Sequence, residues 1–248
     1  MFLGIKDKNI KVNYQDEYVK LPDEIQREID SKWEDMIKEN PYLWNGDTVS
    51  VYDVKIENNI IELFCQKSKY AHHLYQERLG LPKEYECISL SACSLMETKD
   101  GYFVLGELDK NTSNPIMINV PGGGIDKEDI DNNKIDCLKT IIRETKEEVN
   151  IDLNDKNLVK DYHLMGFYQA EEGITPGIQV FAKVELNFTK FEMQKHFADY
   201  YEWLLNNNGQ LELKRIHFLN KNNCLEEFDK FNNPKKSYLR PLLEFNMA

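Results

Sequence analysis

Long apolar runs are absent from this sequence. No stretch of its 248 residues approaches the roughly 18 consecutive apolar residues that a membrane-spanning helix needs. The chain begins Met1-Phe2-Leu3-Gly4-Ile5 and reaches Lys6 and Asp7 before a signal-peptide core could form. The sequence therefore predicts no membrane partner and no signal peptide, and we expect a cytoplasmic protein.

Paired cysteines, linkers and repeats are also missing. None of the cysteines forms a CxxC pair; they are Cys65, Cys87, Cys93, Cys137 and Cys224. An odd and dispersed set disfavours both a disulfide framework and a zinc knuckle. No Pro-rich or Ser-rich linker and no repeat at solenoid periods divides the chain. We expect reduced, buried thiols, and domain boundaries must be predicted from hydrophobic periodicity.

Positive charge is scarce. The chain has 31 Lys+Arg against 43 Asp+Glu, a formal net charge of −12. The longest basic clusters are the pairs Lys214-Arg215 and Lys235-Lys236. A net acidic surface repels phosphate backbones, and these pairs are too short to form a basic patch. The sequence therefore predicts no nucleic-acid partner.

The first third of the chain has a pattern of its own. Apolar residues recur at helical spacing from Ile25 to Ile37, between Pro22, which suits a first helical turn, and Asn40-Pro41, which ends the run. Two strand-like runs follow, 49–56 and 60–65, separated by a plausible hairpin turn. Together they predict an N-terminal extension, residues 1–85, with a helix and a β-hairpin. Such elements form no stable core alone, so we expect the extension to pack on the rest of the chain or to pair across a homodimer.

From residue 86 onward the pattern is rich in strands. We predict strands over 88–96, 102–108, 116–120, 162–170, 178–186 and 211–219, and helices over 136–149, 190–205 and 238–245. This order predicts a second domain, residues 86–248, in which helices cover a mixed sheet. The predicted fold class is α+β.

One segment combines glycines with clustered carboxylates. Gly122-Gly123-Gly124 follows a predicted strand, and Glu144, Glu147 and Glu148 fall within about one 100° arc of the next helix. Taken singly, the glycines are typical of a turn and the glutamates of a solvated helix face. Taken together they favour a phosphate site, because glycines let the backbone approach phosphate oxygens while carboxylates hold a hard cation such as Mg²⁺.

This segment resembles the Nudix box, G-x5-E-x7-R-E-U-x-E-E-x-G-U, where U is a bulky aliphatic residue. The matching residues are Gly123, Arg143, Glu144, Glu147, Glu148 and Ile151. Three positions depart from the pattern: Thr145 replaces the aliphatic residue, Asn150 the second glycine and Ile135 the first glutamate. Asn150 is a mild change, because asparagine tolerates a left-handed helix end. The interval from Gly123 to Arg143 is six residues longer than the pattern, so Glu128 or Asp129 is a candidate to replace the missing glutamate.

The resemblance implies a Nudix-like αβα sandwich and a hydrolase that cleaves a nucleoside diphosphate linked to another group. Upstream, the 40–46 and 70–73 segments loosely resemble Nudix enzymes that act on UDP-sugars. It also implies that Glu144, Glu147 and Glu148, with the Gly123 carbonyl, hold Mg²⁺ or Mn²⁺, and that Arg143 orients Glu147. The products would be a nucleoside monophosphate and a phosphorylated remainder.

In that family a loop glutamate often supplies a further ligand or a general base, and here Glu171 and Glu172 are the candidates, although a solvated turn is an equally good interpretation. The substrate would be a nucleotide sugar or an ADP-ribose-like molecule. Ile135 supports an alternative, a catalytically weak or inactive Nudix-like domain that binds a nucleotide as a sensor. A third alternative is an acidic interaction protein without a ligand.

Overall fold

The computed structural model describes residues 1–5, 9–58, 60–170 and 176–247. Its strands are β1 (Phe2–Gly4), β2 (Asn9–Tyr18), β3 (Asp47–Glu57), β4 (Ile60–Lys69), β5 (Ile88–Glu97), β6 (Tyr102–Leu108), β7 (Ile118–Asn119), β8 (Gly122–Gly124), β9 (Ile130–Asp131), β10 (Lys134–Ile135), β11 (Val159–Gln169), β12 (Gly177–Leu186) and β13 (Leu213–Asn220). Its α-helices are α1 (Asp23–Glu39), α2 (Tyr70–Leu79), α3 (Cys137–Val149), α4 (Lys190–Asn206), α5 (Cys224–Asp229) and α6 (Leu239–Met247). Short 3-10 helices lie at Lys83–Tyr85, Lys127–Asp129 and Lys221–Asn223.

Strand β5 joins the parts of the sheet. It runs parallel to β12 along most of its length and pairs antiparallel with β3, β8 and β6 over shorter stretches. The main path is β1-β11-β12-β5-β3-β4-β2-β10-β9, and β6, β7, β8 and β13 branch from it. Because parallel and antiparallel pairs share one sheet, the predicted mixed sheet is confirmed.

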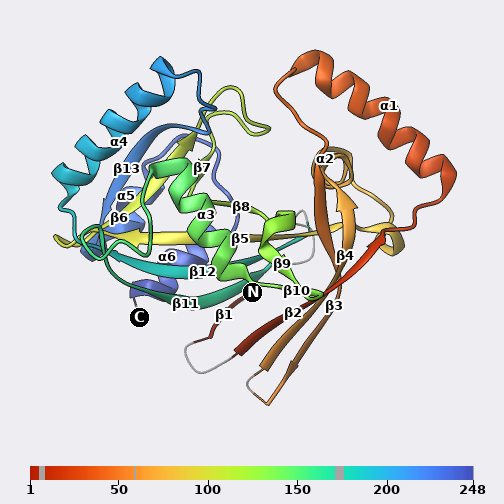
Figure 1. The fold of residues 1–248 in the computed structure, drawn as a ribbon, viewed down its shortest axis with the longest axis horizontal. Coiled ribbons are helices and arrows are strands. Elements are labelled where there is room, and N and C mark those ends of the chain that lie inside the picture. The colour runs from red at the N-terminus through yellow and green to blue at the C-terminus, as the bar shows by residue number, and fades with distance from the viewer. Residues whose placement is uncertain (6–8, 59, 171–175, 248) are drawn as a thin grey trace.

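Helices cover both faces of the sheet around β5. Ala92 and Met96 of β5 belong to the same core cluster as Ile141 of α3. Leu95, which points to the opposite face because strand side chains alternate, belongs to a second cluster with Leu239 of α6. Helix α3 lies in front of the sheet and α6 behind it (Figure 1). The predicted αβα sandwich and α+β class are confirmed.

The N-terminal extension contains the predicted helix, α1, and the predicted hairpin, β3–β4, and it also contains elements that are not predicted from the sequence. Strand β2 runs parallel to β4, and α2 packs against α1 through Ala71 and Tyr75 on Ile29. Strand pairing crosses residue 85, since β1 pairs with β11 and β3 with β5. The extension therefore packs on the rest of the same chain. The boundary at 85/86 stays a prediction.

One predicted strand is shorter in the structure than expected from the sequence. The predicted strand over 116–120 is limited to β7, because Ile116 has a left-handed φ of 60°. The sequence analysis assigns no helix to α5. All five cysteines are buried and free, as expected. Among the residues that the structure describes, no helix combines the length and apolar character needed to span a bilayer.

Candidate active site

Helix α3 presents the carboxylates, and both of its ends are set by side chains that suit them. At its start, Asp136 accepts a hydrogen bond from the backbone N–H of Leu138 at 3.0 Å. At its end, Asn150 takes the left-handed conformation with φ 55° and ψ 38° and donates its N–H to the carbonyl of Lys146. Asparagine adopts this conformation more readily than most residues, so Asn150 performs the role of the glycine in the Nudix pattern.

Strand β8 brings glycine backbone against two of these carboxylates. The N–H of Gly122 donates to Glu148 Oε2 at 3.1 Å. A Cβ on Gly122 would lie 2.5 Å from the carbonyl oxygen of Ala92, and a Cβ on Gly123 would lie 2.3 Å from Glu144 Oε1. Because real Cβ atoms do not approach backbone atoms this closely, the contact between β8 and β5 requires glycine at position 122, whereas a side chain at position 123 would displace the flexible Glu144 carboxylate.

The structure adds a third carboxylate to this pair. Carboxylate oxygens of Glu144, Glu148 and Glu212 lie within 4.8 Å of one another. Glu144 is 7% exposed and Glu148 6% exposed, and Glu212, just before β13, is half-buried. Glu212 joins the cluster from a distant part of the sequence, and its backbone is held by a 2.8 Å hydrogen bond from Asp109 N–H to the Glu212 carbonyl. We call these three residues the carboxylate cluster.

Burial disfavours the ionised forms of the three carboxyl groups in the carboxylate cluster. Desolvation raises the pKa of Glu144 to about 7, partly offset by Arg143. Desolvation, followed by the like charges of Glu212 and Glu144, raises the pKa of Glu148 well above its ordinary value. The pKa of Glu212 is raised by desolvation and by the charge of Glu147. Buried carboxylates this close together are stabilised in their ionised form by a cation.

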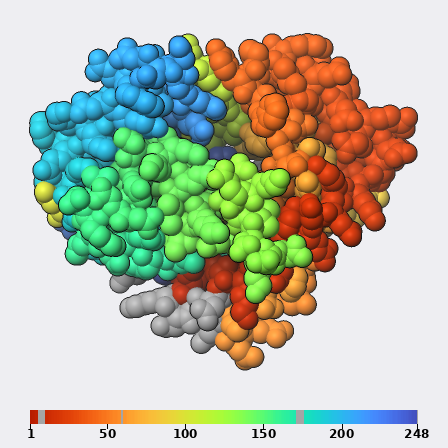
Figure 2. Space-filling model, viewed as in Figure 1, coloured from red at the N-terminus to blue at the C-terminus, as the bar shows by residue number. Residues whose placement is uncertain are grey.

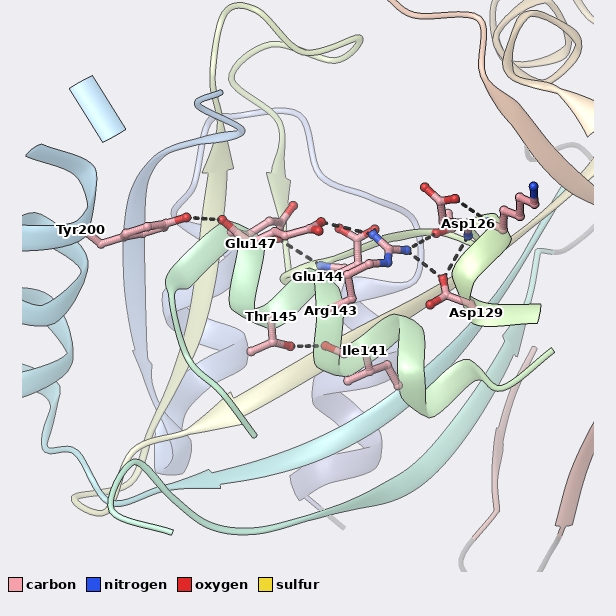
Figure 3. Close-up of polar contacts among 12 residues, drawn as sticks. Asp126, Asp129, Ile141, Arg143, Glu144, Thr145, Glu147 and Tyr200 are labelled. Atoms are coloured by element: carbon pink, nitrogen blue, oxygen red, sulfur yellow. Dashed lines mark hydrogen bonds and ion pairs between the residues drawn. The ribbon is translucent and has the colours of Figure 1, made fainter. Parts of the chain in front are cut away.

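Arg143 links the helix to the preceding loop (Figure 3). Its guanidinium group lies 2.7 Å from Glu144 Oε1, 3.2 Å from Glu147 Oε2 and 2.8 Å from Asp129 Oδ2. It also donates to the carbonyl of Gly124 at 3.1 Å. The contact with Glu147 is the one that the sequence resemblance implies. Glu147 itself is exposed and lies outside the carboxylate cluster.

The departures from the Nudix pattern have local explanations. Of the two candidates for the missing glutamate, Asp129 is buried and contacts Arg143, whereas Glu128 is exposed. Ile135 is a buried residue of β10. The longer interval between Gly123 and Arg143 contains the β9–β10 hairpin, whose turn residues Asn132 and Asn133 both have positive φ, as a two-residue type I′ turn requires. Strand β10 pairs with β2, so the longer loop extends the N-terminal part of the sheet.

Thr145 is buried although an aliphatic residue occupies its position in the pattern. Its hydroxyl donates to the carbonyl of Ile141 at 2.6 Å and lies 3.0 Å from Ser94 Oγ of β5. Both polar contacts are made inside the protein, so the hydroxyl is buried without a missing hydrogen bond. The substitution therefore attaches α3 to β5.

The structure does not test the roles of the remaining predicted site residues. Glu171 and Glu172 lie outside the described residues. Gly123 lies in β8 against Glu144, and its role as a carbonyl ligand stays a prediction. Glu212 is not identified from the sequence, because the only local signal is an acidic residue between Leu211 and Leu213, a common pattern at the start of a strand.

Comparisons with known proteins find matches only among solved structures. No family model and no curated protein matches the chain. A Nudix hydrolase from Nitrosomonas europaea matches with 10% identity and a TM-score of 0.38, over 63% of this chain and 86% of that one. The MutT protein from Methanosarcina mazei matches with 13% identity and a TM-score of 0.39, over 65% and 94%.

A bifunctional NMN adenylyltransferase/ADP-ribose pyrophosphatase from Francisella tularensis, complexed with AMP and a manganese ion, matches with 11% identity and a TM-score of 0.44. This match covers 70% of the present chain and 45% of that one. These names agree with the family that the sequence resembles. At such identities and TM-scores, the function has to be inferred from the site itself.

Proposed function

We propose that the protein is a divalent-metal-dependent pyrophosphohydrolase. It would cleave the diphosphate of a nucleoside diphosphate derivative, a nucleotide sugar or an ADP-ribose-like molecule, to a nucleoside monophosphate and a phosphorylated product. The observation that carries the proposal is the buried carboxylate cluster of Glu144, Glu148 and Glu212 against the glycine strand β8.

The donor set fits a hard divalent cation. All three groups of the carboxylate cluster offer oxygen, which Mg²⁺ and Mn²⁺ prefer. Within the described residues, Arg143 makes an ion pair with Glu144, whereas neither Glu148 nor Glu212 has an ion-pair partner. The cluster is thus short of positive charge. When bound, the metal would polarise the phosphate and acidify the attacking water.

The chain's own residues have distinct proposed roles. Glu144, Glu148 and Glu212 would hold the metal, and we retain Glu147 and the Gly123 carbonyl as further ligands. Arg143 would position the Glu144 and Glu147 carboxylates through its contacts at 2.7 and 3.2 Å. Glu147, with Glu171 and Glu172, stays a candidate for the base that accepts the proton of the attacking water.

The alternative of a catalytically weak or inactive nucleotide-binding domain depends on Ile135. Asp129 contacts Arg143 at 2.8 Å and so supplies a carboxylate where Ile135 does not. This contact favours the hydrolase over the sensor.

The test is hydrolysis of a panel of nucleotide sugars and dinucleotides with Mg²⁺, Mn²⁺ or EDTA, with products identified by mass spectrometry. We expect turnover that EDTA abolishes and that Glu148→Gln nearly eliminates. Glu128→Gln, an exposed carboxylate of the same segment, is the control and should retain activity. No turnover of any compound, or turnover that Glu148→Gln leaves unchanged, would contradict the proposal. Stabilisation by a nucleotide without turnover would instead support the sensor.

A further inference from the structure

A cavity of about 410 Å³ lies where the N-terminal extension meets the rest of the chain. Its walls come from β3 and α2, from β5 and β12, from the 113–119 segment and from the C-terminal segment 235–238. Gly122, Gly123 and Gly124 of β8 also line it. Figure 2 shows a narrow hollow between the orange surface of the N-terminal extension and the green surface of the central part of the chain. Such a volume falls within the roughly 300–1,000 Å³ typical of small-molecule sites.

The cavity and the carboxylate cluster share strand β8. Gly122 binds Glu148 through its N–H, and Gly123 lies against the Glu144 carboxylate, yet both also border the cavity. When the diphosphate of a substrate lies at the carboxylate cluster, the group attached to that diphosphate can therefore reach into the cavity. This inference rests on the proposed function.

The described lining residues include apolar and polar groups, and the charged ones are Glu77, Lys235 and Lys236. Lys235 donates from Nζ to the carbonyl of Phe231. Lys236 Nζ lies 3.2 Å from Glu77 Oε1, and Asn114 Nδ2 donates to the same carboxylate at 3.4 Å. Glu77 is on α2, and Lys236 follows Pro234, whose carbonyl accepts a 2.8 Å hydrogen bond from Ile118 N–H of β7. The pair thus joins the N-terminal extension to the C-terminal segment across the cavity. Because each charge neutralises the other, the pair suits a neutral ligand with several hydroxyl groups better than another phosphate.

His73 adds a hydrogen-bonding atom of defined type. Its Nδ1 lies 3.0 Å from the carbonyl oxygen of Cys87, so Nδ1 carries the hydrogen. Burial lowers the pKa of His73 to about 4, which keeps the ring neutral and makes Nε2 an acceptor. Nε2 is buried and has no hydrogen-bond partner among the described residues. An unpaired buried acceptor beside a polar cavity is satisfied when a ligand hydroxyl donates to it.

Aromatic surface for stacking a base is limited. Among the described lining residues the aromatic side chains other than His73 are Tyr70 and Tyr238. Tyr238 is buried, donates to Asn119 Oδ1 and packs its ring against Phe181 at 5.2 Å between centroids. Bases are usually held by stacking on aromatic faces, whereas sugars are held by directional hydrogen bonds to hydroxyl groups.

We propose that this cavity binds the glycosyl part of a nucleotide-sugar or ADP-ribose-type substrate, with Glu77, Lys236 and His73 as the residues that determine its specificity. Glu77 and His73 Nε2 accept hydrogen bonds from sugar hydroxyls, and Lys236 donates to a hydroxyl oxygen. The base then lies outside the cavity, on the other side of the diphosphate.

The test compares glycosylated and unglycosylated diphosphates by calorimetric binding in EDTA, where no metal-dependent turnover occurs. The probes are UDP-glucose and ADP-ribose, each against UDP and ADP. For wild type we expect at least one glycosylated compound to bind about tenfold more tightly than its parent diphosphate, the effect of a few well-placed hydrogen bonds. Glu77→Gln and Lys236→Gln should reduce this ratio to about threefold or less.

Matched controls remove one charge of the same sign outside the cavity. Glu84→Gln and Lys230→Gln alter exposed residues and should keep the wild-type ratio. Equal binding of glycosylated and parent compounds by wild type, or a wild-type ratio in both Glu77→Gln and Lys236→Gln, would overturn the inference. The binding measurement needs no turnover. Absence of hydrolysis in the substrate panel would therefore contradict the proposed function, whereas the binding ratios alone test the proposed sugar site in the cavity.

Discussion

Two regions bordering β8 contain buried or half-buried carboxylates, and they differ in charge balance. On the α3 side, among the described residues, Glu144 makes an ion pair with Arg143, whereas Glu148 makes none. On the cavity side, the Glu77 carboxylate pairs with Lys236 at 3.2 Å. A buried carboxylate by itself therefore does not indicate a metal site. An excess of negative charge favours a metal site, whereas a neutralised carboxylate favours recognition of a neutral polar group.

Removal of one charge from the carboxylate cluster tests this comparison most severely. Glu148→Gln keeps the side-chain volume but removes a buried oxygen charge, so we expect kcat with Mg²⁺ to fall by roughly 100-fold or more. Glu77→Gln should instead alter discrimination among substrates. Steady-state kinetics on the best substrate of the panel measure both. Comparable kcat values for the two variants would contradict the proposed difference between a metal site on the α3 side and a site for a neutral polar group on the cavity side.

A methyl group on β8 tests the contact between the glycines and the carboxylate cluster. In Gly123→Ala the new Cβ would lie 2.3 Å from Glu144 Oε1, so the flexible carboxylate must move. We expect apparent Mg²⁺ affinity to fall by about tenfold, as for other changes that misplace a ligand, with little change in melting temperature. Gly124→Ala is the control, since its Cβ meets nothing closer than Thr48 Oγ1 at 3.7 Å. Equal Mg²⁺ affinities in the two variants would contradict this expectation.

Asp129→Asn tests whether Asp129 supports the site through Arg143. Loss of this buried charge leaves Arg143 with one carboxylate fewer, so we expect the free energy of unfolding to fall by roughly 1–3 kcal/mol and kcat to fall severalfold. Urea unfolding and kinetics measure the two effects. Glu128→Gln should change neither, because Glu128 is exposed. An Asp129→Asn variant as stable and active as wild type would remove Asp129 from the supporting network.

The smallest effect concerns pH and metal. The pKa of Glu144 is about 7 in the folded protein and 4.5 ordinarily, so the folded state holds a proton that the unfolded state releases. The contribution of Glu144 to stability in EDTA should therefore decline as pH rises from about 4.5 to about 7. Mg²⁺ should raise the melting temperature more at pH 8 than at pH 5, because it binds the ionised form. Melting scans of wild type and Glu144→Gln check this, and a metal-induced shift independent of pH in wild type would be evidence against it.

Local sequence signals predict much of the molecule. The 3.6-residue period predicts α1, α3 and α4, and the alternation of apolar residues predicts the long strands β5, β11 and β12. The conformation of Asn150 follows from the tolerance of asparagine for positive φ. Strands β1 and β2 are not predicted, since their pairing partners, β11 and β4, lie elsewhere in the chain. Pairing between distant segments leaves little trace in the local pattern.

The segment that carries the glycines, Arg143 and the helical glutamates can be found from the sequence alone, because helix geometry fixes which glutamates share a face and the glycines directly follow a predicted strand. Three contacts become visible only in the folded chain: Asp129 with Arg143, Glu212 with the other carboxylates of the cluster, and Glu77 with Lys236 across the cavity. Those contacts depend on how the β9–β10 hairpin, β13 and the C-terminal segment pack around the sheet. Residues far apart in sequence meet only through such packing, which no local periodicity encodes.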